Sequence, residues 1–178
     1  MNLYARGFNL YLLSIAVLLA AAAGCQSDKD KGDQHLASLR LHLENRAQLP
    51  DAGKTVSVIR ANPVLVTINE EPVLTEASIV RADLLDTPVG YAVEVKFDET
   101  GTYTLEQYTS AYQGKHFVIF GQWSEDATNS RWLAAPLITH RIANGEFAFT
   151  PDASHEEAKQ LVLGLNNMAK KIAKGKSK

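Results

Sequence analysis

The side chains in this sequence that are best suited to metal binding or catalysis are its histidines and its one cysteine. The five histidines are His35, His42, His116, His140 and His155. No two of them stand at the spacing of a zinc-binding pair, and a single cysteine cannot complete a multi-cysteine site. The sequence also contains no phosphate-binding glycine loop, no nucleophile elbow and no cysteine–histidine couple. We therefore expect no metal, no cofactor, no small-molecule substrate and no enzymatic activity.

Two runs of acidic residues have a structural explanation. Asp98-Glu99 stands between an expected strand and an expected helix, and Glu156-Glu157 follows His155 at the start of the last expected helix. Carboxylates are favoured at helix N-termini, because the helix dipole places partial positive charge there. We interpret both runs as helix-start residues rather than as acid–base pairs or metal ligands.

Cys25 ends a segment with the pattern of an export signal. One base, Arg6, precedes a nearly unbroken apolar run from 11 to 23. A membrane span needs about 20 residues, so this run fits the apolar core of a signal peptide better. The sequence Ala22-Ala23-Gly24-Cys25 resembles the lipobox of bacterial lipoproteins. The resemblance implies cleavage before Cys25 and its acylation, and several acyl chains give stable membrane anchoring. The alternative is a free or buried thiol behind an ordinary cleavage site.

The residues after the cysteine predict a flexible tether. Positions 26–34 read Gln-Ser-Asp-Lys-Asp-Lys-Gly-Asp-Gln and include no apolar side chain. A segment of this composition cannot bury surface and remains flexible. We therefore expect a lipoprotein signal peptide at 1–24 and a tether at 25–35.

The rest of the chain has the periodicity of an α+β domain. Alternation of apolar and polar residues favours strands, which we expect at 38–44, 56–60, 64–69, 91–97, 116–121, 132–139 and 146–150. Asn144-Gly145 is a strong hairpin signal between the last two of these strands.

Helical spacing predicts three helices. Thr75 caps a short first helix, and a second helix covers 101–112. The inner face of the first helix would carry Ile79, Ala82 and Leu85. The last helix has an apolar stripe from Ala158 to Ile172. Ser154 and Glu157 stand at capping-box spacing before that stripe.

A series of short stretches after Leu74 occurs in a distinctive order. The main ones are 73–75 with 79–82, 93–98 followed by Gly101, 108–109, 114–115, 117–120, 134–138, 141–145, 147–150 and 156–158 with Leu161. In order and spacing they resemble the head subdomain of the large periplasmic loop of SecD, in the SecD/SecF protein-export membrane protein family. The likeness covers more than half of the chain that follows Cys25.

The resemblance implies a fold and a division of the chain. It implies a ferredoxin-like α+β sandwich with a mixed or antiparallel sheet and two main helices on one face. The head-like domain would cover 74–174, preceded by an N-terminal strand region at 36–73. SecD carries transmembrane helices after this module, and we expect none after Cys25 here. The resemblance therefore implies contact with non-native or extended polypeptide, but not proton-driven translocation.

The expected function is binding without turnover. The chain would be a lipid-anchored module of the bacterial envelope, facing the periplasm or the exterior, that contacts exported chains or envelope complexes. The alternative is an accessory lipoprotein that binds one specific folded partner. The 18 basic residues nearly balance the 20 acidic ones, which argues against nucleic acid as a partner.

Aromatic residues beside a polar loop are the candidate contacts. Trp123 and Trp132 flank the loop at 124–131, and Pro136 lies in the stretch that follows. Aromatic side chains give large contact area at low entropic cost and are common interface anchors. Packing of both tryptophans under the loop is the alternative, and we favour it slightly.

The lipobox generates a direct test. Cys25→Ser should prevent acylation, because the thiol is the acceptor, and should leave the protein soluble or stalled as precursor. Membrane fractionation and intact-mass measurement of the mature protein check this. Wild-type protein without acyl chains, together with a Cys25→Ser variant that still fractionates with membranes, would show that the lipoprotein prediction is wrong.

Overall fold

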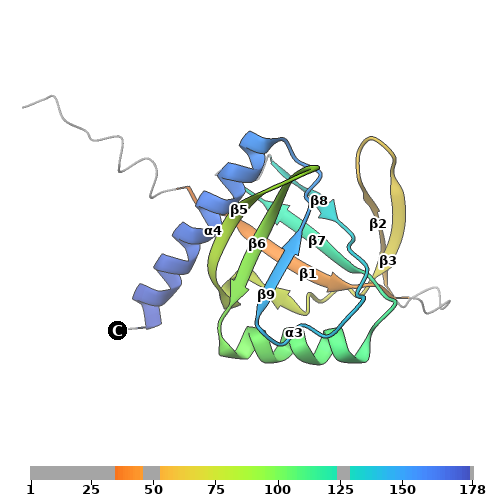
Figure 1. The fold of residues 1–178 in the computed structure, drawn as a ribbon, viewed down its shortest axis with the longest axis horizontal. Coiled ribbons are helices and arrows are strands. Elements are labelled where there is room, and N and C mark those ends of the chain that lie inside the picture. Colours follow the sequence, from red (N-terminus) through yellow and green to blue (C-terminus); the bar gives the residue numbers. More distant parts are fainter. Residues whose placement is uncertain (1–34, 46–52, 124–128, 177–178) are drawn as a thin grey trace, which may run out of the picture. The chain divides into compact units, whose positions relative to one another are not determined.

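Three antiparallel sheets and two helices make up the described part of the chain. The computed structural model describes residues 35–45, 53–123 and 129–176 (Figure 1). Cys25, the predicted signal peptide and tether residues 25–34 lie outside the described residues. Within the described ranges, the structure contains no helix of the length and apolarity that a membrane crossing requires.

Two of the sheets face each other. The larger has the strand order β4-β1-β7-β8 and contains β1 (Ser38–Leu43), β4 (Leu74–Thr75), β7 (Phe117–Gln122) and β8 (Ser130–Ala134). The smaller has the order β5-β6-β9 and contains β5 (Ile79–Thr87), β6 (Gly90–Phe97) and β9 (Glu146–Phe149). All of their strand pairs are antiparallel.

The remaining elements surround these sheets. A two-stranded hairpin is formed by β2 (Lys54–Val58) and β3 (Val64–Ile68). Helix α3 (Glu99–Ala111) contacts β4 and β6, and helix α4 (His155–Lys176) lies along β5 and β1. The predicted α+β class is confirmed, and its strands are distributed over three antiparallel sheets rather than one.

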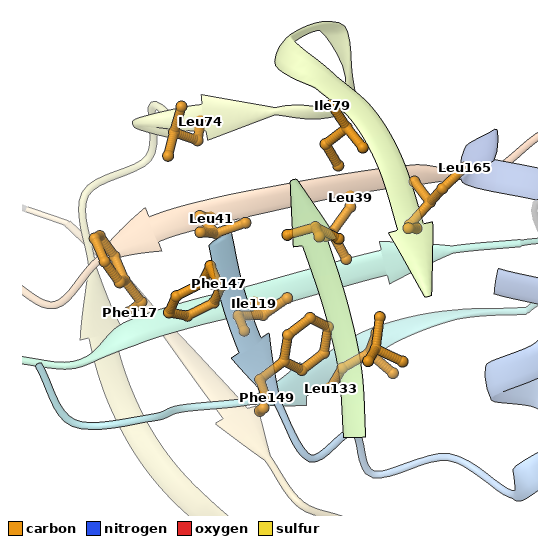
Figure 2. Close-up of a cluster of buried hydrophobic side chains, with 14 of the residues drawn as sticks. Leu39, Leu41, Leu74, Ile79, Phe117, Ile119, Leu133, Phe147, Phe149 and Leu165 are labelled. Atoms are coloured by element: carbon orange, nitrogen blue, oxygen red, sulfur yellow. The ribbon is translucent and has the colours of Figure 1, made fainter. Parts of the chain in front are cut away.

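The core lies between the two facing sheets (Figure 2). Leu39 and Leu41 of β1 point into it, as do Phe147 and Phe149 of β9. The alternation read from the sequence accounts for this arrangement, because every second residue of a strand faces the same side. A second, smaller cluster on the other face of β7 joins Val118 to the β2–β3 hairpin. Strand β7 is therefore buried on both faces.

The predicted apolar stripe of the last helix is confirmed. Leu161 and Leu165 are both 1% exposed and belong to the main core. Gly164 permits a close approach to the start of β1, since a Cβ added there would lie 2.7 Å from that of Ala37. The Asn166 side chain donates to the Ala82 carbonyl at 2.8 Å and accepts from the Ala82 N–H at 3.0 Å. Helix α4 is thus joined to β5 by polar as well as apolar contacts.

The predicted helix from Thr75 is wrong. Thr75 does cap a helical turn, but the 3-10 helix η1 (Glu76–Ser78) ends after three residues and β5 begins at once. A β-bulge between Ile79 and Arg81 shifts the phase of this strand. Ile79 and Ala82, three residues apart, therefore both face the core. A strand with this bulge has the same apolar spacing as one face of a helix.

The predicted hairpin between the last two strands is also wrong. Gly145 has a φ of 72° and makes the expected turn, but this turn leads into β9, which pairs with β6. Strand β8 ends at Ala134 and pairs with β7. The chain between 135 and 145 therefore connects two different sheets, and Leu137 within it makes only an isolated bridge to His116.

Burial of the α4 stripe can be tested with a matched pair of variants. Leu165→Asp should unfold the domain, because burying an unpaired carboxylate costs several kcal/mol out of a total stability of about 5–15 kcal/mol. Leu163→Asp lies on the same helix at a residue that is 47% exposed, and its melting temperature should stay close to that of the wild type. Thermal denaturation followed by circular dichroism measures both. Equal melting temperatures for the two variants would contradict the packing of α4.

Candidate functional site: a cleft beside a sheet edge

The two tryptophans lie in different environments. Trp123 is 1% exposed and belongs to the main core, with the Arg131 guanidinium 4.8 Å from its ring centroid. Its Nε1 has no hydrogen-bond partner in the described part of the chain. A contact role for Trp123 does not fit this position, because a partner could not reach the ring. The packing alternative accounts for Trp123.

Trp132 is half-buried on the other face of the larger sheet. Its ring packs edge-on against His42, with 5.3 Å between ring centroids, and against Phe120, at 5.2 Å. A hollow of about 270 Å³ adjoins these rings, with Arg40 and Lys54 among its lining residues. Burial lowers the pKa of His42, although its hydrogen bond to a backbone carbonyl acts in the opposite direction. Trp132 remains available as a contact residue.

Pro136 lines a larger cleft. The cleft has a volume of about 610 Å³, within the range of binding pockets for small ligands and short peptides. Its apolar lining includes Pro136, Leu137, Ile138, Ile142, Phe147 and Ala148. Leu137 is 50% exposed, so apolar surface is accessible there.

The connection between the two sheets forms one wall of this cleft. The Pro136 carbonyl accepts from the Phe117 N–H at 3.1 Å, and the Ile138 N–H donates to the Lys115 carbonyl at 2.8 Å. Further along, the Ile142 N–H donates to the Thr109 hydroxyl of α3 at 3.0 Å. Because both ends of the connection are bonded to regular elements, the wall is held in place. Its position follows from pairing to β7 and α3.

The floor and the opposite wall come from the two sheets. The Phe117 and Phe147 rings meet edge to face with 5.7 Å between centroids (Figure 2). Phe117 belongs to β7 of the larger sheet and Phe147 to β9, the edge strand of the smaller sheet. Both residues line the cleft, so the cleft lies beside this edge.

The charges at the rim of the cleft are paired within the domain. Arg141 forms an ion pair with Glu106 of α3, and Glu146 pairs with Lys96 at 2.8 Å. The Asn144 amide also donates to Glu146 at 3.1 Å. The cleft therefore presents apolar surface between neutralised charges, which suits an uncharged ligand.

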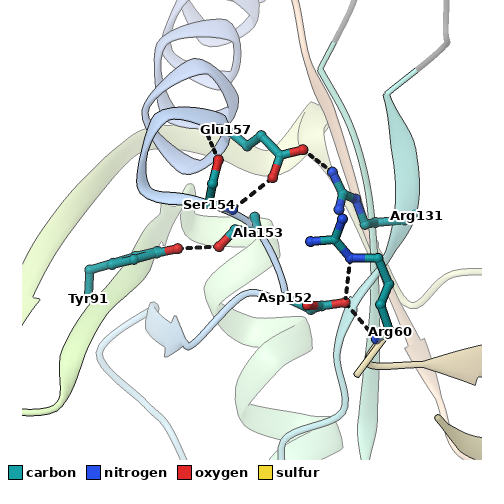
Figure 3. Close-up of polar contacts among 7 residues, drawn as sticks. All are labelled: Arg60, Tyr91, Arg131, Asp152, Ala153, Ser154 and Glu157. Carbon is teal, nitrogen blue, oxygen red and sulfur yellow. Dashed lines mark hydrogen bonds and ion pairs between the residues drawn. The ribbon is translucent and has the colours of Figure 1, made fainter. Parts of the chain in front are cut away.

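A polar cluster at the start of α4 explains the second acidic run (Figure 3). The Ser154 N–H donates to Glu157 at 2.7 Å and the Glu157 N–H donates to the Ser154 hydroxyl at 3.2 Å, which confirms the predicted capping box. Glu157 also pairs with Arg131 of β8. Nearby, Asp152 accepts from the Arg60 N–H at 2.8 Å and from its side chain at 3.2 Å. The cluster joins α4 to β8 and to the β2–β3 hairpin.

The other acidic run is also a helix start. Asp98 is the N-cap of α3, and its carboxylate accepts from the Gly101 N–H at 2.9 Å. Among the described residues there is no group of three His, Cys, Asp or Glu side chains able to hold a metal ion. One residue of each run, Asp98 and Glu157, thus has a structural partner, and Glu99 and Glu156 lie in the first turns of their helices.

Comparison with known proteins identifies the family. Residues 52–169, more than half of the chain, match the model of the SecDF P1 head subdomain. The chain belongs to this family. The match begins at residue 52 and so includes the β2–β3 hairpin as well as the elements after Leu74. No curated protein matches the chain.

Two solved structures share the fold. One is of SecDF, described as a membrane component that enhances protein export; it is 20% identical, with a TM-score of 0.53, over 80% of this chain and 69% of that chain. The other is a crystal structure of SecDF in a super-membrane-facing form, 21% identical with a TM-score of 0.56 over 80% of this chain. The likeness spans only 21% of that second chain.

The sequence singles out Pro136 as a candidate contact but does not single out the other residues that line the cleft. The sequence pattern predicts Leu137 in a strand and Ile142 in a hairpin connection, because the Asn144-Gly145 turn indicates that the strands at 132–139 and 146–150 pair. The only available signal was the proline in the middle of the predicted strand at 132–139, since proline interrupts a strand ladder. That signal favours an early strand end but does not reveal a cleft.

The polar cluster at α4 predicts acid sensitivity. Burial alone would raise the pKa of Glu157, but the Ser154 N–H and Arg131 lower it below its ordinary value of 4.5. Burial would likewise raise the pKa of Asp152, and Arg60 lowers it. A carboxyl with a lowered folded-state pKa contributes stability above its unfolded pKa, and this contribution is lost as pH falls through the folded value.

The free energy of unfolding should therefore decrease from about pH 5 downward. Glu157→Gln should reduce stability near neutral pH and flatten this acid dependence, because the amide does not titrate. Glu156→Gln changes an exposed residue of the same helical turn and is the control. Urea denaturation at a series of pH values measures the effect. An unchanged slope in Glu157→Gln would contradict the role given to this carboxylate.

Proposed function

We propose that this chain is a lipid-anchored module of the bacterial envelope that binds polypeptide without catalysis. Cys25 carries the lipid, and the head-like domain faces the periplasm or the exterior. Its clients are exported chains or the exposed segments of envelope complexes. Membership of the SecDF P1 head family supports this proposal, since a solved relative is described as enhancing protein export.

The observation that carries the proposal is the apolar cleft beside Pro136. Leu137 offers exposed apolar surface there, while Arg141 and Glu146 are already paired with charges of the domain. Non-native polypeptide exposes apolar side chains that folded proteins bury, and such segments gain free energy when they leave water. Trp132, on the other face of the larger sheet, is a second contact point.

A second candidate function is that of an accessory that binds one folded envelope partner. The outer surface of the β2–β3 hairpin favours it, because Leu65 is 72% exposed and Val64 beside it is 46% exposed. Adjacent exposed apolar residues on a strand are typical of interaction surfaces. A single partner recovered with the intact lipoprotein would favour this function.

Binding to a permanently unfolded, reduced and alkylated protein tests the first function. Leu137→Asp should weaken binding roughly tenfold, because removal of an apolar anchor typically costs more than 1 kcal/mol. Its melting temperature should change little, since the residue is half exposed. Val89→Asp, at a residue that is 98% exposed and not part of the cleft, should bind like the wild type. Fluorescence anisotropy provides the affinities.

The same assay includes Trp132→Ala, which should weaken binding if the second contact point is used. Wild-type affinity in both Leu137→Asp and Trp132→Ala would argue against binding at these surfaces. Absence of any binding to unfolded protein, with one folded partner captured, would replace the first function by the accessory role.

A further inference from the structure

Among the described residues, no strand pairs with the edge of β9 that faces away from β6. Strand β9 is the last strand in the order β5-β6-β9. The Phe97 N–H donates to the Gly145 carbonyl at 2.9 Å. Phe97 and Gly145, which lie opposite each other, are therefore a hydrogen-bonded pair of residues. In an antiparallel ladder such pairs alternate with non-bonded pairs. The next bonded pair is therefore Val95 with Phe147, and the pair Glu94 with Ala148 is non-bonded.

This alternation directs backbone groups of β9 outward. The N–H and C=O of Ala148 point away from β6, as does the C=O of Glu146. The Glu146 N–H points the same way and is already bonded, because the Asn144 side chain accepts from it at 3.2 Å. The pairing leaves the Ala148 backbone without a strand partner, and this residue is exposed.

The opposite edge of the same sheet, formed by β5, has a hydrogen-bonding partner. There, the Asn166 side chain of α4 bonds both the N–H and the C=O of Ala82, as a neighbouring strand would. An uncovered strand edge is a template for pairing with another chain, and proteins normally protect such edges. One edge of this sheet is thus capped by a side chain, while the edge beside the cleft has no strand partner in the part of the chain that the structure describes.

We propose that β9 accepts an extended, uncharged segment of polypeptide as an additional strand, with alternate side chains in the cleft. The inference rests on the proposed function and gives it a binding mode. Backbone hydrogen bonds to Ala148 and Glu146 would supply affinity without regard to sequence, and the apolar lining would select alternate apolar side chains. A domain that receives many different clients needs this combination.

The charge at the rim favours this occupant over others. Arg141 and Glu146 already have partners, so a charged segment would gain no new ion pair there and would lose hydration. The chain's own residues 26–34 are rich in charge and fit poorly for this reason. The occupant is also short: β9 ends between the turn at Gly145 and buried Pro151, which leaves room to pair with about four residues at roughly 3.3 Å each.

Backbone-modified peptides test this mode on the wild-type domain. The probe is a fluorescent nonapeptide of alternating Val and Thr, with two derivatives that carry N-methyl groups on either the odd or the even residues. Only one edge of a bound strand faces β9, so one derivative should lose binding at least tenfold and the other should bind nearly as well as the parent. Amide hydrogen exchange of Ala148 should slow when the parent peptide binds.

A substitution on the acceptor strand provides the second arm. Ala148→Pro removes the outward N–H and places the proline ring in the path of an added strand, and proline is tolerated on edge strands. It should lose peptide binding at least tenfold with a melting temperature close to that of the wild type. Ala148→Ser keeps the N–H and is the matched control. If Ala148→Pro fails to fold, the two N-methylated peptides and the exchange measurement decide alone.

Each outcome has a distinct meaning. Equal binding of both N-methylated peptides, with unslowed exchange at Ala148, would overturn strand addition and leave side-chain binding in the cleft. A peptide-free dimer that Ala148→Pro dissociates would overturn it in favour of a second copy on the same edge. If neither the nonapeptide nor unfolded protein binds, the proposed function itself fails.

Discussion

The structure depends on the packing of a three-stranded sheet against a four-stranded one. The apolar faces of β1, β7 and β9 can leave water only where the sheets overlap, and the core between them is formed by residues such as Leu41, Ile119 and Phe149 (Figure 2). The narrower sheet does not cover all of the wider one. Phe117 at the start of β7 packs edge-on against Phe147, and its N–H donates to the Pro136 carbonyl of the connection. The cleft is the space that this mismatch leaves.

The two edges of the three-stranded sheet differ in how they are covered. The β5 edge is closed by α4, whose Asn166 takes the place of a strand partner for Ala82. The β9 edge is only four residues long, and no described residue bonds to it as Asn166 bonds to β5. A short edge limits uncontrolled association. A short edge above an apolar cleft would combine low aggregation risk with the strand addition that we propose.

The charged residues have mainly structural roles in this domain. Arg131 of β8 pairs with Glu157 of the α4 capping box (Figure 3). Its guanidinium also lies over the ring of buried Trp123, so one side chain joins the core, β8 and α4. Asp152 links the same corner to the hairpin through Arg60. Buried polar groups need such partners, because an unpaired one costs more than it contributes. These charged residues therefore stabilise the scaffold, and the binding that we propose would rest on apolar surface and backbone groups.

Features that depend on near neighbours along the chain can be read from the sequence alone. The α4 stripe, the Ser154–Glu157 capping box and the strands at β1, β6 and β7 follow from spacing along the chain, and the order of motifs indicated the SecD head. Tertiary structure decided whatever depends on a distant partner. The bulge after Ile79 gave a strand the spacing of a helix, and β9 paired with β6 instead of β8. Trp123 and Trp132 flank one loop, yet Trp123 enters the core and Trp132 lies on the other face of its sheet. Local patterns fix which residues alternate, but only strand pairing fixes which face is covered and which edge stays open.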